Sequence, residues 1–347
     1  MIFWYLLILV VALVNIRVCK KGFYPDYIGK EQCNAIKGLF IMLVILGHII
    51  AEFKEIGLDF EQPVNHSAYL FYKGMGQLVV AMFLFYSGYG VMKSLLTRGN
   101  EYLVSYPKSR LLTTLLNFDI AVCLYFPLAL ITDYQMNWST VLLSFIGWES
   151  LGNSNWYIFV ILLCYLVFYL VFKLVRSRHL AGGILVTLIL FGAMLFLHEA
   201  KNLSCWYNTI LVFPAGIFFA MFSERLEPFV QKYYWLSLAA LLAVFLILHF
   251  GNLRPLHGLT FNFQAIVFAL LLVVLTMKVR IQNKWLIWCG ISLFPLYIYH
   301  RWMMIAFRNG AGEAWVCANP HLYIGLCFIL TAAVALLYNK YLRIKLR

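Results

Sequence analysis

"KGLFIMLVILGH" (residues 37–48) sets an apolar run between a lysine and a histidine. Everything between Lys37 and His48 is apolar or glycine, which predicts a helix inside a membrane. At 1.5 Å of rise per residue, the two ionisable groups lie roughly 16 Å apart, about half the hydrocarbon thickness of a bilayer. Lys37 can therefore lie at one membrane surface while His48 lies near or beyond the middle. An ionisable group at that depth is costly and points to a function.

Composition identifies the class of protein. The chain has 347 residues, of which 63% are hydrophobic and 12% are charged, with a mean hydropathy of +0.84. A soluble domain carries about a quarter charged residues. We therefore predict an all-α, polytopic transmembrane helix bundle. The eight cysteines form no CxxC pair, so neither a metal site nor a disulfide framework is indicated, and sequence alone does not pair Cys205 with Cys317.

Apolar runs predict about eleven spans. The first run, residues 1–18, has no basic residue before it and no small-residue cleavage site, so we interpret it as a retained helix rather than a signal peptide. Residues 19–34 form a linker, and residues 342–347 form a basic tail. The predicted limits are 1–18, 35–53, 76–96, 111–132, 156–175, 181–198, 207–223, 234–250, 262–278, 285–306 and 321–341.

Positive charge favours an external N-terminus and a cytoplasmic C-terminus. When the loops alternate from an external N-terminus, 21 of the 27 Lys and Arg residues fall in internal segments and six in external ones. This asymmetry follows the positive-inside rule. It also accounts for the net charge of +13 without a nucleic-acid partner. A basic cytoplasmic face attracts anionic membrane lipid, and would equally attract an anionic cytosolic substrate.

Two histidines are expected at similar depth. The spans 35–53 and 285–306 both start inside, and they carry His48 and His300 about 13 and about 15 residues from their starts. The alternative for His48 is an interhelical histidine that serves packing alone. Arg301 follows His300 and is either a site residue or an arginine that extends its charge to the interface.

Three other polar residues lie in or beside predicted spans. Ser87, in FLFYSGYG, belongs to a small-residue segment typical of close helix packing. Asp119 is a carboxylate at a costly depth and is expected to have a partner or a function. Glu52 lies four residues beyond His48 on the same helical face. It either orients the imidazole, as a carboxylate does in a triad, or is exposed at the helix exit.

Five segments carry a family resemblance. The Lys37-x10-His48 pair is followed by MFLFYSGYGVMKS, YPKSRLLTTLL, NSNWYIFVILLCYLVF and ISLFPLYIYHRW. In this order, over residues 35 to 305, they resemble the motifs of the acyltransferase-3 family of integral-membrane acyl-transfer proteins. The chain departs from the family pattern at Lys37, where arginine is usual, and at Thr113, which replaces the second arginine after Arg110.

The resemblance implies an acyltransferase. It implies about ten core helices over residues 35–341, to which 1–18 is an addition, in a bacterial plasma membrane. It also implies transfer of an acyl group from cytosolic acyl-CoA, typically acetyl-CoA, to a hydroxyl of a cell-surface or lipid-linked glycan. Cations at the cytoplasmic rim would bind the donor phosphates by charge-assisted hydrogen bonds. Those cations are Lys37, Lys108 and Arg110.

The resemblance also suggests roles for the groups deeper in the bundle. His48 would be the general base, with a covalent acyl-histidine as the alternative. His300 and Arg301 would bind the acceptor or neutralise the developing oxyanion. Trp156 and Tyr157 would either stack on a sugar ring or anchor their helix at the interface. The external segments 54–75 and 133–155 are polar and aromatic enough to shape an acceptor groove. The partner that the resemblance implies is a carbohydrate or glycolipid acceptor.

Two other classes of protein are compatible with the composition. A transporter or flippase for a glycan or lipid precursor is the first, although no internal repeat with matched helix breaks is present. A non-catalytic scaffold is the second, and it predicts that glutamine or asparagine can replace His48 without loss of function.

Overall fold

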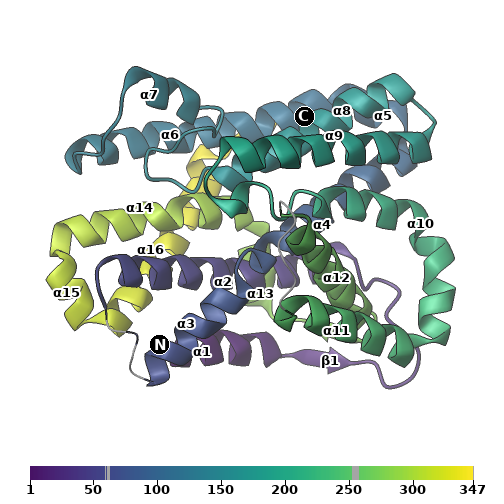
Figure 1. Cartoon of the computed structure of the whole chain (residues 1–347), viewed down its shortest axis with the longest axis horizontal. Coiled ribbons are helices and arrows are strands. Elements are labelled where there is room, and N and C mark those ends of the chain that lie inside the picture. Colours follow the sequence, from purple (N-terminus) through teal and green to yellow (C-terminus); the bar gives the residue numbers. More distant parts are fainter. Residues whose placement is uncertain (59, 61–62, 252–257, 347) are drawn as a thin grey trace.

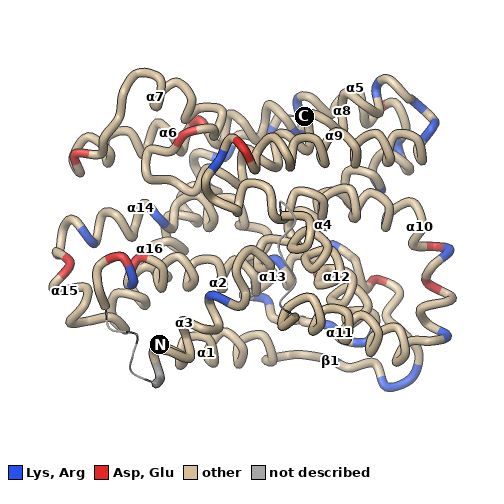
Figure 2. Tube along the Cα trace, in the orientation of Figure 1, with Lys and Arg blue, Asp and Glu red and all other residues tan. Residues whose placement is uncertain are grey.

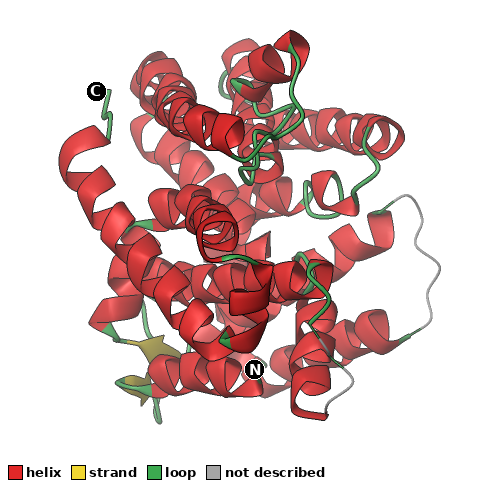
Figure 3. Cartoon of the chain, turned by 90° about the vertical axis from the view of Figure 1, so that its left-hand side faces the viewer, coloured by secondary structure: helices red, strands yellow, loops and turns green. Residues whose placement is uncertain are grey.

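The molecule is an all-helical bundle with one small two-stranded sheet (Figures 1 and 3). The computed structural model describes residues 1–58, 60, 63–251 and 258–346. Arg254 and Arg347, two of the cations counted above, lie outside this range. The helices are α1 (Ile2–Leu13), α2 (Lys30–Glu55), α3 (Pro63–Met75), α4 (Leu78–Arg98), α5 (Asn100–Tyr106), α6 (Thr113–Ile131), α7 (Trp138–Ser144), α8 (Trp156–Val175), α9 (His179–Ala200), α10 (Val212–Lys232), α11 (Tyr234–Phe250), α12 (Leu259–Thr276), α13 (Lys284–Ile291), α14 (Leu293–Ala311), α15 (Glu313–Ala318) and α16 (Pro320–Leu337).

The remaining elements are short. The π-helical turns η1 (Pro107–Leu112) and η3 (Tyr338–Leu342) join or extend α-helices, and η2 (Ser204–Trp206) is a 3-10 turn. Strands β1 (Ile16–Val18) and β2 (Val279–Ile281) pair antiparallel, with Arg17 opposite Arg280. They occupy one corner of the bundle (Figure 3).

The prediction of an all-α polytopic bundle is confirmed, although fewer segments qualify as spans than expected. Seven helical segments are long and apolar enough to cross a membrane, or eight if the bent pair α10–α11, with its angle of 103°, is one span. The sequence predicted about eleven. The predicted spans 207–223 and 234–250 form the bent pair, and 285–306 is divided between α13 and α14 at Ser292. The seven segments are Lys30–Glu55, Asn65–Arg98, Asn100–Ile131, Trp156–Val175, His179–Ala200, Leu259–Thr276 and Pro320–Leu342.

The predicted first span is also shorter than its apolar run. Helix α1 has 12 residues and ends at Leu13, because Asn15 has a positive φ of 61° and the chain then enters β1. Twelve residues rise roughly 18 Å, well short of the hydrocarbon thickness of about 30 Å. Residues 1–18 therefore form a short helix followed by a strand. The helix α1 packs beside α2 and α3 (Figure 1).

Close helix contacts depend on glycine at two pairs of helices. A Cβ on Gly88 of α4 would overlap the Phe213 carbonyl oxygen of α10, and a Cβ on Gly216 of α10 would overlap the Phe85 carbonyl oxygen. A Cβ on Gly38 of α2 would likewise overlap the Leu286 carbonyl oxygen of α13. Small residues allow this approach of backbones, which stabilises helix pairs inside a membrane. The FLFYSGYG segment is therefore a packing segment, and glycines bring α4 against α10 and α2 against α13.

Replacing Gly88 by alanine tests this packing. We expect Gly88→Ala to destabilise the protein by about 1–3 kcal/mol, because the new methyl group must displace backbone rather than a flexible side chain. Gly90→Ala, in the same helix, is the matched control, since nothing lies within 4 Å of its Cβ position. Thermal unfolding in detergent should separate the two variants. Equal melting temperatures would contradict the packing account.

Segments expected on the same side of the membrane contact one another in the structure. At one end β1 pairs with β2, and Tyr27 donates a hydrogen bond to Glu227 (2.7 Å), all of them segments expected inside. At the other end Lys201 forms an ion pair with Glu149 (3.4 Å), both expected outside. Many of the Lys and Arg residues lie toward the right-hand end of the bundle in Figure 2. The alternation of loops deduced from charge is thus compatible with the fold.

Candidate active site

A cavity of about 480 Å³ opens beside His48. Its walls come from α2, α3, the start of α4, the loop 150–155, the turn η2 and α14, with one residue from α1. The lining is rich in aromatic rings and neutral amides. Among the described residues that line the cavity, Arg301 is the one side chain with a permanent charge. The rings include Tyr5, Phe71, Tyr72, Tyr134, Trp156, Trp206 and Tyr297, and the amides are Gln77, Asn153 and Asn155. Such a lining suits a neutral, hydroxyl-rich molecule.

The structure brings His48 and His300 into direct contact. Nδ1 of His48 on α2 lies 2.5 Å from Nε2 of His300 on α14, and the ring centroids are 4.7 Å apart. His300 has no exposed surface, whereas His48 lines the cavity. Two helices that are far apart in the sequence thus place one imidazole behind the other, and the front one faces the cavity.

The hydrogen bonds determine which nitrogen of each neutral ring carries the proton. Nδ1 of His300 lies 3.2 Å from the carbonyl oxygen of Leu296. A carbonyl only accepts, so this Nδ1 must donate, and Nε2 of a neutral His300 then presents a lone pair. Nδ1 of His48 therefore donates to His300. Nε2 of His48 is left with a free lone pair and has no hydrogen-bond partner among the described residues, so it can accept a proton from a molecule in the cavity.

Two residues that line the same cavity carry unpaired polar atoms. Arg301 lines the cavity, and its buried Nε has no hydrogen-bond partner among residues the structure describes. Its charge lies close to both imidazole rings. The buried Nδ2 of Asn153, in the loop before α8, is also without a partner in that range. An unpaired buried donor is costly, and both residues line the cavity, so either donor can pair with a polar ligand once its side chain turns toward the cavity.

The loop that carries Asn153 is held by its own hydrogen bonds. The Oγ of Ser150 donates to the carbonyl oxygen of Asn153 (2.7 Å), and the Leu151 N–H donates to Oδ1 of Asn153 (3.0 Å). Asn155 donates from Nδ2 to the Gly147 carbonyl oxygen (2.8 Å). Short polar side chains that bond to nearby backbone fix such loops. The segment 133–155, expected outside and expected to shape a groove, thus supplies a wall of the cavity that its own hydrogen bonds hold in place.

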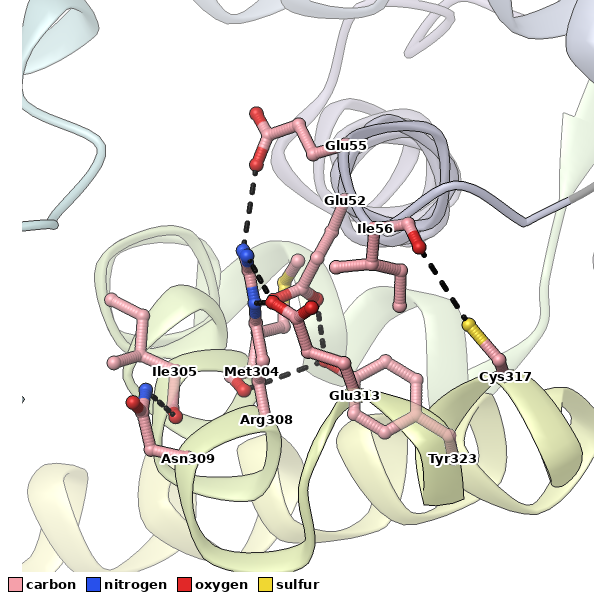
Figure 4. Close-up of polar contacts among 10 residues, drawn as sticks. All are labelled: Glu52, Glu55, Ile56, Met304, Ile305, Arg308, Asn309, Glu313, Cys317 and Tyr323. Carbon is pink, nitrogen blue, oxygen red and sulfur yellow. Dashed lines mark hydrogen bonds and ion pairs between the residues drawn. The ribbon is translucent and has the colours of Figure 1, made fainter.

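Glu52 makes no hydrogen bond with His48 among the described residues, and it is buried rather than exposed at the helix exit, so the structure matches neither predicted role. It is 7% exposed and accepts a hydrogen bond from the Tyr323 hydroxyl of α16 (Figure 4). Position i+4 shares the helix face of His48 but lies one turn, roughly 6 Å, closer to the C-terminal end of α2. The side chain that hydrogen-bonds the His48 ring is His300.

The carboxylate of Glu52 belongs instead to a network that ties helix ends together. Arg308 of α14 forms ion pairs with Glu55 of α2 (3.7 Å) and with Glu313 of α15 (2.5 Å). The Tyr323 hydroxyl lies 3.4 Å from the Met304 carbonyl oxygen (Figure 4). The network therefore joins α2, α14, α15 and α16 one turn beyond the histidine pair, where it can maintain the distance between α2 and α14.

The cations expected at the cytoplasmic rim lie away from this cavity. Lys37 and Arg110 are half-buried, and their charges are close enough to repel each other. Neither pairs with a carboxylate in the described part of the chain, and Lys108 is exposed. Two half-buried cations without a counter-ion attract an anion. Lys37, Lys108 and Arg110 are not among the described residues that line the cavity. The cavity therefore ends before it reaches these cations.

The other predicted site residues divide into two groups. Trp156 lines the cavity, and Tyr157 lies behind it, where its ring packs 5.3 Å from Tyr297. Ser87 interacts with Tyr157. Neither Ser87 nor Asp119 lines the cavity, and Oδ1 of Asp119 is buried without a hydrogen-bond partner among the residues described. The structure thus brings Trp156, but not Asp119, together with His48.

The cavity also contains one cysteine side chain. Cys205 lines the cavity, but burial raises the pKa of its thiol to about 11, so the thiol stays protonated and is a poor nucleophile at neutral pH. All eight cysteines are free, including Cys317. No group of three His, Cys, Asp or Glu side chains with the geometry of a metal site occurs in the described residues.

Several cavity residues were not predicted. Tyr5 comes from the first helix, Gln77 from the start of α4, and Trp206 from a turn between two spans. Their positions depend on packing between distant segments, and nothing local distinguishes them from interfacial aromatic residues. The polar run before Trp156, "SLGNSN", is the one local signal, and it does mark this wall.

Comparison with known proteins identifies the family. The profile described as an acyltransferase domain, that of the acyltransferase-3 family, matches residues 31–340. The match covers α2 to the end of α16 and excludes α1 and β1. No curated protein and no solved structure matches the chain. With its long apolar helices, this integral membrane protein belongs to the acyltransferase-3 family and is an acyltransferase.

Proposed function

We propose that the protein transfers an acyl group, typically acetyl, from cytosolic acyl-CoA to a hydroxyl of a cell-surface or lipid-linked glycan, with His48 as the general base. The observation that carries the proposal is the hydrogen bond of 2.5 Å between His48 and His300, because it leaves the lone pair of His48 Nε2 available at the cavity. The lining of aromatic rings and amides supports a carbohydrate or glycolipid as the acceptor.

The reaction needs one base and one anion stabiliser. The acceptor hydroxyl gives its proton to His48 Nε2 while its oxygen attacks the thioester carbonyl carbon. Arg301, whose Nε is unpaired, stabilises the oxyanion of the tetrahedral intermediate. The C–S bond then breaks, the intermediate becomes an ester, and His48 returns its proton to the departing CoA thiolate. The imidazole ends in its starting form.

The donor is bound at the opposite end of the same helix. Lys37 and Arg110 hold the phosphates of CoA by charge-assisted hydrogen bonds, and Lys108 adds positive charge at the rim. About 16 Å along α2 separate Lys37 from His48, so only a long, thin acyl-bearing arm can join the two sites. Because the cavity ends before the cations, side chains between the sites must move when the donor binds.

Sealed membrane vesicles of defined orientation test the proposed function. Acetyl-CoA labelled in the acetyl group is supplied only to the cytoplasmic face, with glycan acceptor on the other face, and acetylated glycan and free CoA are measured on each side. We expect labelled glycan on the external face and one free CoA on the donor face for each acetyl transferred. A transporter would instead move glycan without forming ester, and that result would overturn the proposal.

Removing the cation at position 37 should affect the donor. We expect Lys37→Ala to raise the KM for acetyl-CoA about 10- to 100-fold, because a charge-assisted hydrogen bond contributes about 1.5–3 kcal/mol. Lys37→Arg should restore most of the affinity, and Lys30→Ala, an exposed cation on the same helix, is the control. An unchanged KM in Lys37→Ala would exclude this residue from the donor site.

A further inference from the structure

Helix α1 contributes to the cavity although it lies outside the residues that match the family. The match begins at residue 31, whereas Tyr5 lines the cavity. Tyr5 is 7% exposed, and its ring centroid lies 4.5 Å from that of Phe71 of α3, another lining residue. One wall of the cavity therefore comes from a helix that is additional to the family core.

The helix is fixed at both ends. Near its start, Trp4 donates a hydrogen bond to Nδ1 of His321 (3.1 Å) and stacks on Phe328 at 6.1 Å, both in α16. Near its end, Asn283 donates to the Val11 carbonyl oxygen (2.8 Å), and β1 pairs with β2 immediately afterwards. These contacts hold Tyr5 in one position against the cavity.

The same wall continues to the residue beside His48. Tyr5 interacts with Tyr72 of α3, and a Cβ on Gly47 of α2 would lie only 3.3 Å from the Tyr72 ring. Tyr5, Phe71, Tyr72 and Gly47 all line the cavity. A change at Tyr5 is therefore a change in the wall that borders the candidate base.

We propose that Tyr5 is a specificity-determining residue that contacts the acceptor through its ring and hydroxyl. The Tyr5 hydroxyl makes no hydrogen bond with any described residue, so it can serve a sugar hydroxyl. Tyr5 and His48 line the same cavity, in the half of the bundle expected outside. The rim cations proposed to bind the donor lie outside this cavity. The inference rests on the proposed function, and it assigns acceptor selection in part to α1.

Kinetics with two forms of one acceptor test this role. The glycan that the wild-type protein labels is used intact and after shortening by partial hydrolysis, with wild type, Tyr5→Phe, Tyr5→Ala and Phe3→Ala. Phe3 is 58% exposed on the same helix and does not line the cavity, so it is the matched control. The KM for each glycan form, the KM for acetyl-CoA and the melting temperature are measured for each variant.

We expect Tyr5→Phe to raise the KM for glycan about three- to tenfold, which corresponds to one hydrogen bond. Tyr5→Ala should raise it at least tenfold and change the ratio of kcat/KM between the two glycan forms, with the KM for acetyl-CoA unchanged. Tyr5→Phe keeps the ring packing, so its result holds even if Tyr5→Ala folds poorly. Values equal to those of Phe3→Ala would overturn the inference alone. A wild-type protein that labels no glycan would overturn the proposed function and this inference with it.

Discussion

Replacing His48 by glutamine is expected to reduce acyl transfer about 10²–10⁴-fold, the usual contribution of a general base. Glutamine can still donate a hydrogen bond to Nε2 of His300, so packing and polarity are largely retained. It has no basic lone pair that can take a proton from a hydroxyl near neutral pH. The loss should therefore appear in kcat, with little change in melting temperature or in the KM for acetyl-CoA.

Initial rates with purified protein measure this effect. His66→Gln, at an exposed histidine of α3, is the control and should keep full activity. His48→Ala should lose as much activity as His48→Gln, because both lack the base. A glutamine variant within about threefold of wild type would support the scaffold alternative and exclude general-base catalysis by His48.

The second large effect is expected at His300. Replacing it by leucine removes the acceptor for the Nδ1 proton of His48, so the ring can rotate or adopt the tautomer with its proton on Nε2. Loss of the tautomer-fixing group in a serine-protease triad costs up to about 10⁴-fold. We expect a decrease of about 10²–10³-fold in His300→Leu, measured as kcat with the KM for acetyl-CoA unchanged.

Partial rescue separates positioning from general stability. The amide oxygen of glutamine can accept the Nδ1 proton of His48, so His300→Gln should be at least tenfold more active than His300→Leu. His300 has no exposed surface, and leucine suits such a site at least as well as glutamine does. If the two variants were equally inactive, or if activity followed melting temperature, the tautomer argument would be wrong.

Local sequence signals were sufficient for most of the fold. A run such as residues 156–175 is apolar throughout, and any such segment must satisfy its backbone hydrogen bonds within a helix. The signal failed where a tertiary feature divides or shortens an apolar run. Residues 1–18 end in a strand because β2, more than 250 residues away, is available to pair with it. The break at Ser292 and the bend between α10 and α11 have no comparable mark in hydropathy.

The candidate site was predictable only where depth alone determines position. His48 and His300 are expected at similar depth, and the structure brings them into contact even though the second predicted span is divided at Ser292. Glu52 lies on the right face of α2, but the direction of its side chain depends on Tyr323, which is 271 residues away in the chain. The contribution of Tyr5 to the cavity likewise depends on how α1 docks, which the sequence does not encode locally.

The most direct test of the central claim is acetyl transfer by purified protein in liposomes. Wild type and His48→Ala are compared, with labelled acetyl-CoA as donor and host glycan as acceptor, and ester-linked label on the glycan is counted. We expect label on glycan with wild type and a loss of at least 100-fold with His48→Ala, at equal amounts of folded protein. Equal labelling by the two proteins would contradict a base at His48.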